Sequence, residues 1–279
     1  MDLPIWRWLE IIQILKRNCE NLFKINFLIC YNFIINFTKS NAAGEQQELL
    51  KVDWSFKSFF GKFDRASLQR GYQVYTEVCA SCHSLKHLSY RNLAEKGGPE
   101  FTELEAKAIA SNFEVTDGPN SDGEMFERPA KLSDKFVMPY ANVQEAIAAN
   151  GGAYPPDMSV LVKARSGGAN YIYSVLMGYD EPPAGMELDD GVYYNKYMYG
   201  NKIKMSSPLD DDIVEYSDGT KATVDQMAKD VTTFLQWTAE PHLETRHKLG
   251  FRVIIYLSVL TVLVYFSMKK IWSRIETKV

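Results

Sequence analysis

Five consecutive residues limit the possible fold of this 279-residue chain more than any other feature. They are Cys79, Ala80, Ser81, Cys82 and His83: two thiols separated by two residues and followed directly by an imidazole. In a C-x-x-C-H arrangement each thiol adds to one vinyl group of a haem, and the histidine ligates the iron. We therefore predict one covalently bound haem c, attached through Cys79 and Cys82, with His83 as an axial ligand.

Two other kinds of site use a similar pair of thiols. A zinc site needs a second pair of ligands, but the only other cysteines, Cys19 and Cys30, lie eleven residues apart in an apolar leader. A thioredoxin-like redox pair follows a strand, whereas a helical pattern precedes Cys79. Haem attachment is the stronger interpretation.

The N-terminal residues have the pattern of an export signal. An apolar run over residues 25–37 follows basic residues and precedes the small residues of 40–43. Ser40 and Ala42 would occupy the −3 and −1 positions of a cut after Ala42, as export signals require. We assign residues 1–43 to a signal or leader, with an uncleaved anchor as the alternative.

The C-terminal residues have the pattern of a membrane anchor. Residues 249–268 contain a single charge, Arg252, which can extend to the interface. A helix of this length is about 30 Å long, enough to cross the hydrocarbon core. We predict a transmembrane helix over 248–268, with a buried helix of a soluble protein as the alternative. The basic tail, 269–279, is then cytoplasmic or matrix-side, and the head lies across the membrane.

Charge is unevenly distributed along the chain. Residues 1–43 have a net charge of +2 and residues 249–279 have a net charge of +4. Since the whole chain has a net charge of −4, residues 44–248 have a net charge of −10. An acidic head argues against a nucleic-acid ligand and favours a basic protein partner. The simpler alternative is that the acidic surface only keeps the head soluble.

Two helices are predicted to frame the head, which spans residues 44–247. The first begins with Asp64 as N-cap and leads into Cys79, and the second begins at the capping box of Thr223 and Gln226 and ends before Pro241. Apolar residues recur at helical spacing in both. A further helix is expected over 103–113, and glycine- and proline-rich turns separate the rest. We predict a mainly α fold: a c-type cytochrome head with long loops, plus one C-terminal transmembrane helix.

The residues alone leave the second iron ligand open. His87 and His242 are conceivable ligands, and the head also offers eight methionines: Met125, Met138, Met158, Met177, Met186, Met198, Met205 and Met227. Met227 is expected to pack in the core. Arg165 lies near the Gly167-Gly168 turn, where it could bind a haem propionate or simply face solvent.

From residue 53 to the end of the membrane helix the chain resembles cytochrome c1, the haem subunit of the quinol:cytochrome c oxidoreductase, or bc1 complex. The resemblance rests on segments spread over most of the head. They include Arg70-Gly71, Val74-Tyr75, Cys79–His83, Asp117–Asn120, Gly123–Phe126, Arg128-Pro129, Lys131–Asp134, Asn150–Ala153, Pro155–Asp157, Ala164-Arg165, Gly178-Tyr179, Pro182–Gly185, Glu215-Tyr216, Asp218–Thr220, Ala228–Val231 and Ala239–Pro241.

The resemblance implies roles for four further residues. Met205 occupies the place of the methionine that ligates the iron in the family. The residues after it, Ser206-Ser207-Pro208, depart from the small residues and two prolines usual there. Arg165 matches the arginine that binds a propionate, Tyr171 a tyrosine close to the haem, and Pro156 falls in the haem-pocket loop.

The function implied by the resemblance is a single-electron relay from the Rieske iron–sulfur protein to a soluble or membrane-bound cytochrome c, with no bond-making catalytic residue. Cytochrome b and the lipid bilayer are the other implied partners. Two alternatives are a membrane-anchored haem enzyme with an open iron site, such as a peroxidase, and a haem-bearing assembly subunit. We expect the head on the periplasmic side of a bacterial plasma membrane, with the intermembrane-space side of the mitochondrial inner membrane as the alternative.

Acidic runs in the second half of the head are candidate docking charges. They are Asp180-Glu181, Glu187 with Asp189-Asp190, and Asp210–Asp212. Such charges raise the association rate and make it sensitive to salt. Neutralising Asp210–Asp212 is expected to slow cytochrome c reduction at low ionic strength in stopped-flow measurements, and an unchanged rate would exclude this run.

Overall fold

The computed structural model describes residues 47–276, so the predicted leader, residues 1–43, lies outside the described residues. Helix α2 (Arg65–Glu77) begins where Asp64 caps it, with the Asp64 carboxylate accepting a hydrogen bond from the Ala66 backbone. It leads through Val78 into a short 3-10 turn, η1 (Cys79–Ser81). The predicted helix before the two thiols is confirmed.

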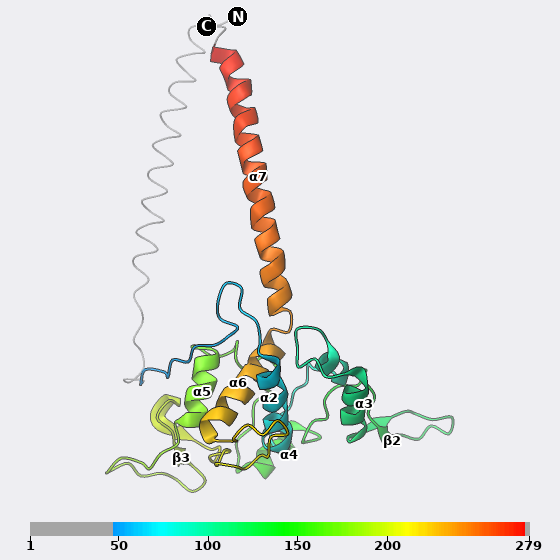
Figure 1. Ribbon diagram of the computed structural model, residues 1–279. Helices are drawn as coiled ribbons and strands as arrows, with labels where there is room; N and C mark the ends of the chain where they lie inside the picture. Colours follow the sequence, from blue (N-terminus) through cyan, green and yellow to red (C-terminus); the bar gives the residue numbers. More distant parts are fainter. Residues whose placement is uncertain (1–46, 277–279) are drawn as a thin grey trace, which may run out of the picture. The chain divides into compact units, whose positions relative to one another are not determined.

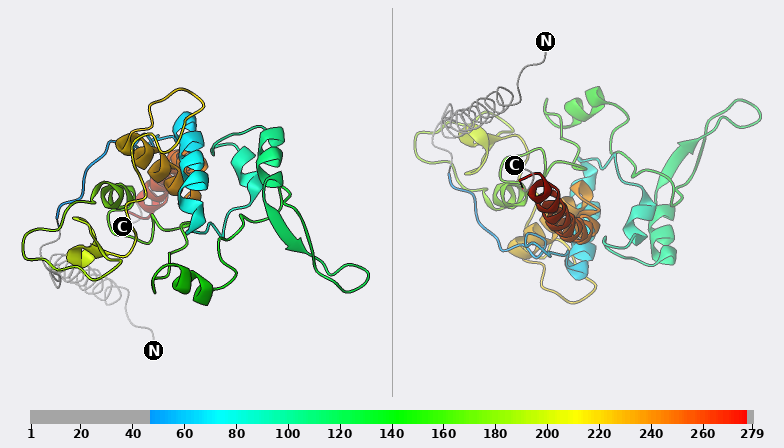
Figure 2. Two further views of the ribbon diagram at one scale, coloured as in Figure 1. Left: turned by 90° about the horizontal axis from the view of Figure 1, so that it is seen from below. Right: turned by 90° about the horizontal axis from the view of Figure 1, so that it is seen from above.

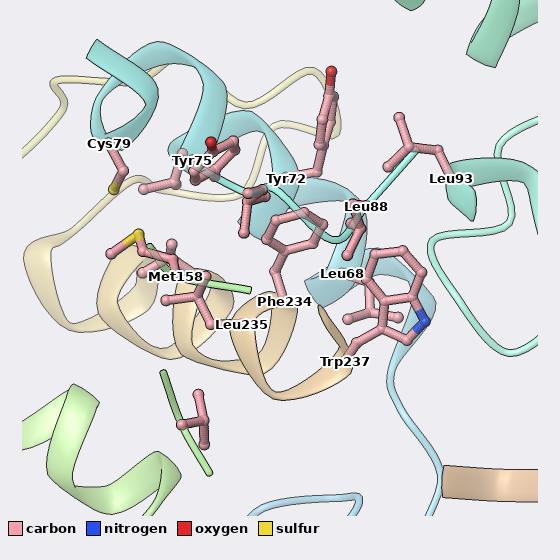
Figure 3. Packing of buried hydrophobic residues seen from close by; sticks show 14 of the residues in the cluster. Leu68, Tyr72, Tyr75, Cys79, Leu88, Leu93, Met158, Phe234, Leu235 and Trp237 are labelled. Carbon is pink, nitrogen blue, oxygen red and sulfur yellow. The ribbon is translucent and has the colours of Figure 1, made fainter. Parts of the chain in front are cut away.

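Helix α6 (Val224–Ala239) is the second predicted frame helix. The Thr223 hydroxyl accepts a hydrogen bond from the Gln226 backbone, as the capping pattern predicted, and the helix ends before Pro241. Its core face is almost fully buried and packs against α2 (Figure 1). Figure 3 shows Phe234 pointing from α6 toward the α2 side chains Leu68 and Tyr72. The same core continues to Cys79 and Met158.

A buried carboxylate joins the two frame helices. Asp230 of α6 is fully buried and accepts hydrogen bonds from Ser67 Oγ at 2.6 Å and Arg70 Nε at 2.8 Å, both on α2. Gln226 Nε2 donates to it at 3.0 Å from the preceding turn of α6. A buried charge is tolerated when it is paired and hydrogen-bonded in this way. This network was not predicted from the sequence.

Short elements joined by loops complete the head (Figure 2). The helical ones are η2 (Tyr90–Ala94), α3 (Glu103–Ser111), α4 (Val143–Ala149), α5 (Ala169–Met177) and η3 (Tyr199–Asn201). Two small antiparallel sheets were not predicted: β1 (Glu114–Asp117) with β2 (Phe126–Pro129), and β3 (Tyr193–Tyr194) with β4 (Lys202–Ile203). Asp117 pairs with Phe126, so the glycine- and proline-containing segment 118–123 lies in the connecting loop of the first sheet. Strands this short leave no recognisable alternation in the sequence.

Helix α7 (Leu243–Glu276) is long and apolar enough to cross a membrane. It begins two residues after Pro241, so it includes polar turns on both sides of the predicted span of 248–268. The large apolar side chains from Leu249 to Trp272 are exposed. Outward-facing apolar side chains are what a lipid-facing helix requires, in contrast to a core helix. The mainly α prediction with one C-terminal membrane-capable helix is confirmed.

Gly71 allows α2 to approach α6 closely. A Cβ at this position would lie 2.1 Å from the carbonyl oxygen of Asp230 and 2.8 Å from the Cβ of Phe234. Gly71→Ala should therefore push the helices apart and lower the free energy of unfolding of the head by about 1–3 kcal/mol. Denaturant unfolding followed by circular dichroism measures this. Gly250→Ala is the control, because nothing lies within 4 Å of the added methyl group.

Candidate haem site

A cavity of about 400 Å³ lies beside the end of α2, and it gathers most of the predicted site residues. The loop of residues 150–161, helix α5 and the segment 198–206 form its other walls. Most of the lining side chains are apolar. The predicted residues that line it are Cys82, His83, Pro156, Arg165, Tyr171 and Met205. Cys79 does not line the cavity but is buried in the same turn as Cys82.

The turn after α2 places both thiols on one side of the chain. The backbone N–H groups of Cys82 and His83 both donate to the Cys79 carbonyl, at 3.2 and 2.9 Å. In a 3-10 turn, residues three apart lie one above the other, which brings Cys79 and Cys82 onto the same face. Burial raises the pKa of the Cys79 thiol to about 12. A reactive thioredoxin-like pair needs a lowered pKa, so that alternative is disfavoured.

A backbone carbonyl orients the imidazole of His83. Nδ1 lies 2.8 Å from the carbonyl oxygen of Pro156, which can only accept, so Nδ1 carries the proton and donates it. Nε2 is left with its lone pair, as a metal ligand requires. Burial lowers the pKa of His83, although the Pro156 carbonyl and the Asp157 carboxylate partly oppose this shift. The ring is therefore neutral near neutral pH.

A tyrosine hydroxyl supports the backbone of each of the two candidate axial residues. Tyr75 on α2 donates to the carbonyl of His83 at 2.9 Å, and Tyr179 donates to the carbonyl of Met205 at 3.1 Å. Neither tyrosine was assigned a role from the sequence. Hydrogen bonds between residues distant in the chain leave no local pattern, although Tyr179 does lie in a segment that carries the resemblance.

Asp157 organises the loop that carries Pro156. One carboxylate oxygen accepts from Ser84 Oγ at 2.8 Å and from the Lys86 backbone at 2.9 Å, and the other accepts from the Ser159 backbone at 3.0 Å. The loop is thereby joined to the residues that follow His83. This role of Asp157 was not predicted from the sequence.

Three of the head methionines line the cavity: Met158, Met198 and Met205. The sulfur of Met198 accepts a hydrogen bond from the Tyr171 hydroxyl at 3.3 Å. Tyr179 donates to the backbone carbonyl of Met205, and the side chain of Met205 packs against the cluster of Val175, Tyr197 and Ile203. His87 and His242 do not line this cavity, so they are poorly placed as ligands.

Arg165 and Tyr171 lie where the loop after residue 161 leads into α5. The Arg165 guanidinium is exposed and donates to the neighbouring Ala164 carbonyl at 3.1 Å, while part of the side chain lines the cavity. An exposed guanidinium beside an apolar cavity suits a ligand that carries carboxylates. These groups together fit a haem: the walls are apolar, the imidazole is neutral with Nε2 free, and the two thiols lie on one face of the turn.

Comparison with known proteins decides the family. A model of the Cytochrome C1 family matches residues 54–275, which is most of the chain. The chain belongs to the cytochrome c1 family. It is therefore a haem protein of electron transport, and the resemblance seen in the sequence is confirmed.

Curated relatives come from bacteria and mitochondria. The chain is 51% identical over 226 residues to "Cytochrome c1, heme protein, mitochondrial" of Saccharomyces cerevisiae, covering 81% of this chain and 72% of the relative. It is 49% identical over 227 residues to "Cytochrome b-c1 complex catalytic subunit, mitochondrial" of Candida albicans, covering 81% and 78%. It is 50% identical over 239 residues to "Cytochrome b/c1" of Bradyrhizobium diazoefficiens, covering 79% of this chain but only 35% of that longer protein.

The Asp157 carboxylate should stabilise the site in a pH-dependent way. Burial raises its pKa, but the hydrogen bonds from Lys86, Ser159 and Ser84 outweigh this effect and lower the pKa below its ordinary value of 3.8. The stabilisation is thus present above that value and is lost as the pH falls through the lowered pKa. Asp157→Asn should reduce the free energy of unfolding by about 1–2 kcal/mol near neutral pH.

Denaturant unfolding of the parent and the variant at several pH values measures this difference. It should shrink in acid, below the ordinary pKa of 3.8. A difference that stays constant with pH would show that the charge of Asp157 does not organise the loop.

Proposed function

We propose that this chain is the haem subunit of a bc1 complex and relays single electrons from a Rieske iron–sulfur protein to a cytochrome c. The observation that carries the proposal is the cavity that brings Cys82 and His83 of the C-x-x-C-H motif together with Met205, in a chain of the cytochrome c1 family. The Candida albicans relative is named as a subunit of the cytochrome b-c1 complex, which supports membership of that complex, with cytochrome b as a neighbour.

We assign His83 and Met205 as axial ligands, and Cys79 and Cys82 as the attachment points of one haem c. The haem supplies a one-electron couple, and histidine–methionine ligation with burial favours a positive potential. The Pro156 carbonyl holds the His83 ring with Nε2 free, and Tyr179 holds the backbone of Met205. A thioether on the second face would close the iron to solvent, as an electron relay requires.

The remaining assigned residues act on the periphery of the haem. Arg165 at the cavity edge would bind a propionate, and Tyr171 and Pro156 would line the pocket. Apolar lining side chains such as Ile172 and Val175 exclude bulk water. Fixed side chains and a dry cavity keep the rearrangement that accompanies electron transfer small. No residue of the chain needs to make or break a bond.

We further propose that α7 crosses an energy-transducing membrane once, with residues 44–247 as the haem head and 269–279 as a short basic tail on the cytoplasmic or matrix side. The apolar, exposed surface of α7 and the basic residues that follow its apolar span, Lys269, Lys270 and Arg274, support this topology. The head is then periplasmic in a bacterium. In a mitochondrion the equivalent side is the intermembrane space.

The structure refines the expected docking charges. Asp211 accepts a hydrogen bond from the Val224 backbone at 2.8 Å at the start of α6, so it has a structural role. Asp210 and Asp212 are exposed and remain candidates for a basic partner. Variants that test docking should therefore leave Asp211 unchanged.

The double variant Asp210→Asn/Asp212→Asn should slow reduction of a basic cytochrome c at low ionic strength, by up to about tenfold, because steering charges act on the association rate. High salt should remove the difference between variant and parent. Stopped-flow reduction of cytochrome c by the intact complex measures both. Asp122→Asn/Glu124→Gln, in the exposed β1–β2 loop, removes the same charge elsewhere on the head and is the matched control.

The ligand assignment is tested by reduced optical spectra of Met205→Ala with and without CO. The parent should give a sharp low-spin spectrum that CO does not change, whereas the variant should bind CO because its iron has lost a ligand. Met158→Leu and Met198→Leu should behave as the parent. CO binding by the parent would favour a haem enzyme with an open site, and CO binding by one of the leucine variants instead would move the ligand to that methionine.

A further inference from the structure

The loop of residues 54–63 displays two aromatic side chains that the proposed function does not use. Phe59 and Phe60 are 62% and 58% exposed, and their rings contact each other edge to face. The flanking aromatic residues Trp54, Phe56 and Phe63 are buried in the head. The loop is therefore anchored at both ends while its tip carries an exposed apolar pair.

Backbone hydrogen bonds and a close backbone approach hold this loop in one shape. Lys57 N donates to the Trp54 carbonyl, Gly61 N to the Ser58 carbonyl and Lys62 N to the Ser55 carbonyl, at 3.0, 2.8 and 3.2 Å. Gly61 lies so close to the backbone of Phe56 that a Cβ would be 2.3 Å from the Phe56 carbonyl oxygen. A loop closed in this way presents its tip with little conformational entropy left to lose on binding.

The tip contacts the first apolar turn of α7. The ring centroids of Phe59 and Phe60 lie 6.5 and 5.4 Å from that of Phe251, which is itself exposed. Figure 1 shows the segment before α2 reaching the lower end of α7. The buried carboxylate of Glu244 accepts from the Phe63 backbone at 3.1 Å and pairs with Arg65 at 2.9 Å. These bonds hold the loop at the level where the apolar span begins.

Basic residues lie close to the aromatic tip and to Phe251 in the sequence. Lys57 and Lys62 flank it in the loop, and Lys248 and Arg252 flank Phe251 on α7; all four are exposed. The aromatic rings lie beside the first apolar turn of α7, and basic residues are next to them in the chain. This combination suits the boundary between lipid acyl chains and phosphate groups. The exposed side chains of α7 continue from the same point, so the apolar surface of the tip joins that of the membrane helix.

We propose that Phe59 and Phe60 insert into the same bilayer that α7 crosses, with Lys57 and Lys62 on its phosphate groups. The head then has a second membrane contact beside its helix. Because Glu244 and the loop lie at one end of α2, this contact would limit the tilt of the head relative to the membrane surface. A protein subunit that covers the tip is the competing outcome.

Phosphatidylcholine that carries a photoactivatable diazirine on its acyl chain tests this proposal. The full chain with its haem is reconstituted in vesicles of this lipid, irradiated and digested with trypsin. Cleavage after Lys57 and Lys62 releases residues 58–62 as one peptide. Met125, exposed to 60% on the β1–β2 hairpin, lies in a different peptide and is the matched control.

We expect lipid adducts on residues 58–62 and on α7, and none on the Met125 peptide. Phe59→Asp/Phe60→Asp should lower adducts on the loop to the level of the Met125 peptide while α7 labelling and the haem spectrum stay unchanged, which shows that the variant is folded and inserted. Labelled α7 with an unlabelled loop in the parent overturns the proposal. The same experiment on the intact complex overturns it if the loop loses its adducts there, because a subunit then covers the tip.

Discussion

The close crossing of α2 and α6 is the contact on which the rest of the head depends. Gly71 lets the two backbones meet, and Asp230 joins them through Ser67 and Arg70 in the buried seam. Because α2 leads directly into the C-x-x-C-H turn, this crossing also sets the position of both thiols and of His83. At the other end of α2, Arg65 pairs with Glu244 and so joins the start of this helix to α7.

Individual hydrogen bonds, more than regular elements, build the opposite side of the cavity. The loop of residues 150–161 and the segment 198–206 contain few repeating backbone bonds, so side chains give them their order. Asp157 joins the first to the residues after His83, and Tyr179 holds the second at Met205. Each hydrogen bond contributes a modest net free energy, but leaving a buried donor or acceptor unpaired costs more. These bonds therefore favour one conformation of the two loops over others. A bound haem would add apolar contact to both walls.

The membrane end and the haem end of the head are linked through the same helix. The aromatic tip and Glu244 lie at the N-terminal end of α2, and the thiols follow its C-terminal end. A rigid helix between them transmits the orientation of one end to the other. The proposed contact between the head and the membrane would therefore also constrain the direction in which the haem edge faces.

Features that depend on neighbouring residues in the chain could be predicted from the sequence. The C-x-x-C-H motif, the caps at Asp64 and Thr223, and the apolar C-terminal span are all local patterns, because hydrogen bonding within a turn and helical periodicity involve residues a few positions apart. The family resemblance also came from local segments, and it pointed to Met205 where composition and spacing could not choose among the methionines.

Which distant residues meet across the fold became known from the packing of the folded chain. The pairing of His83 with Pro156 spans 73 residues, and that of Ser67 with Asp230 spans 163. The folded chain also shows that three methionines line the cavity, that Asp211 caps a helix and that Phe59 contacts α7. Such contacts depend on how distant segments pack, and no local pattern in the chain encodes them.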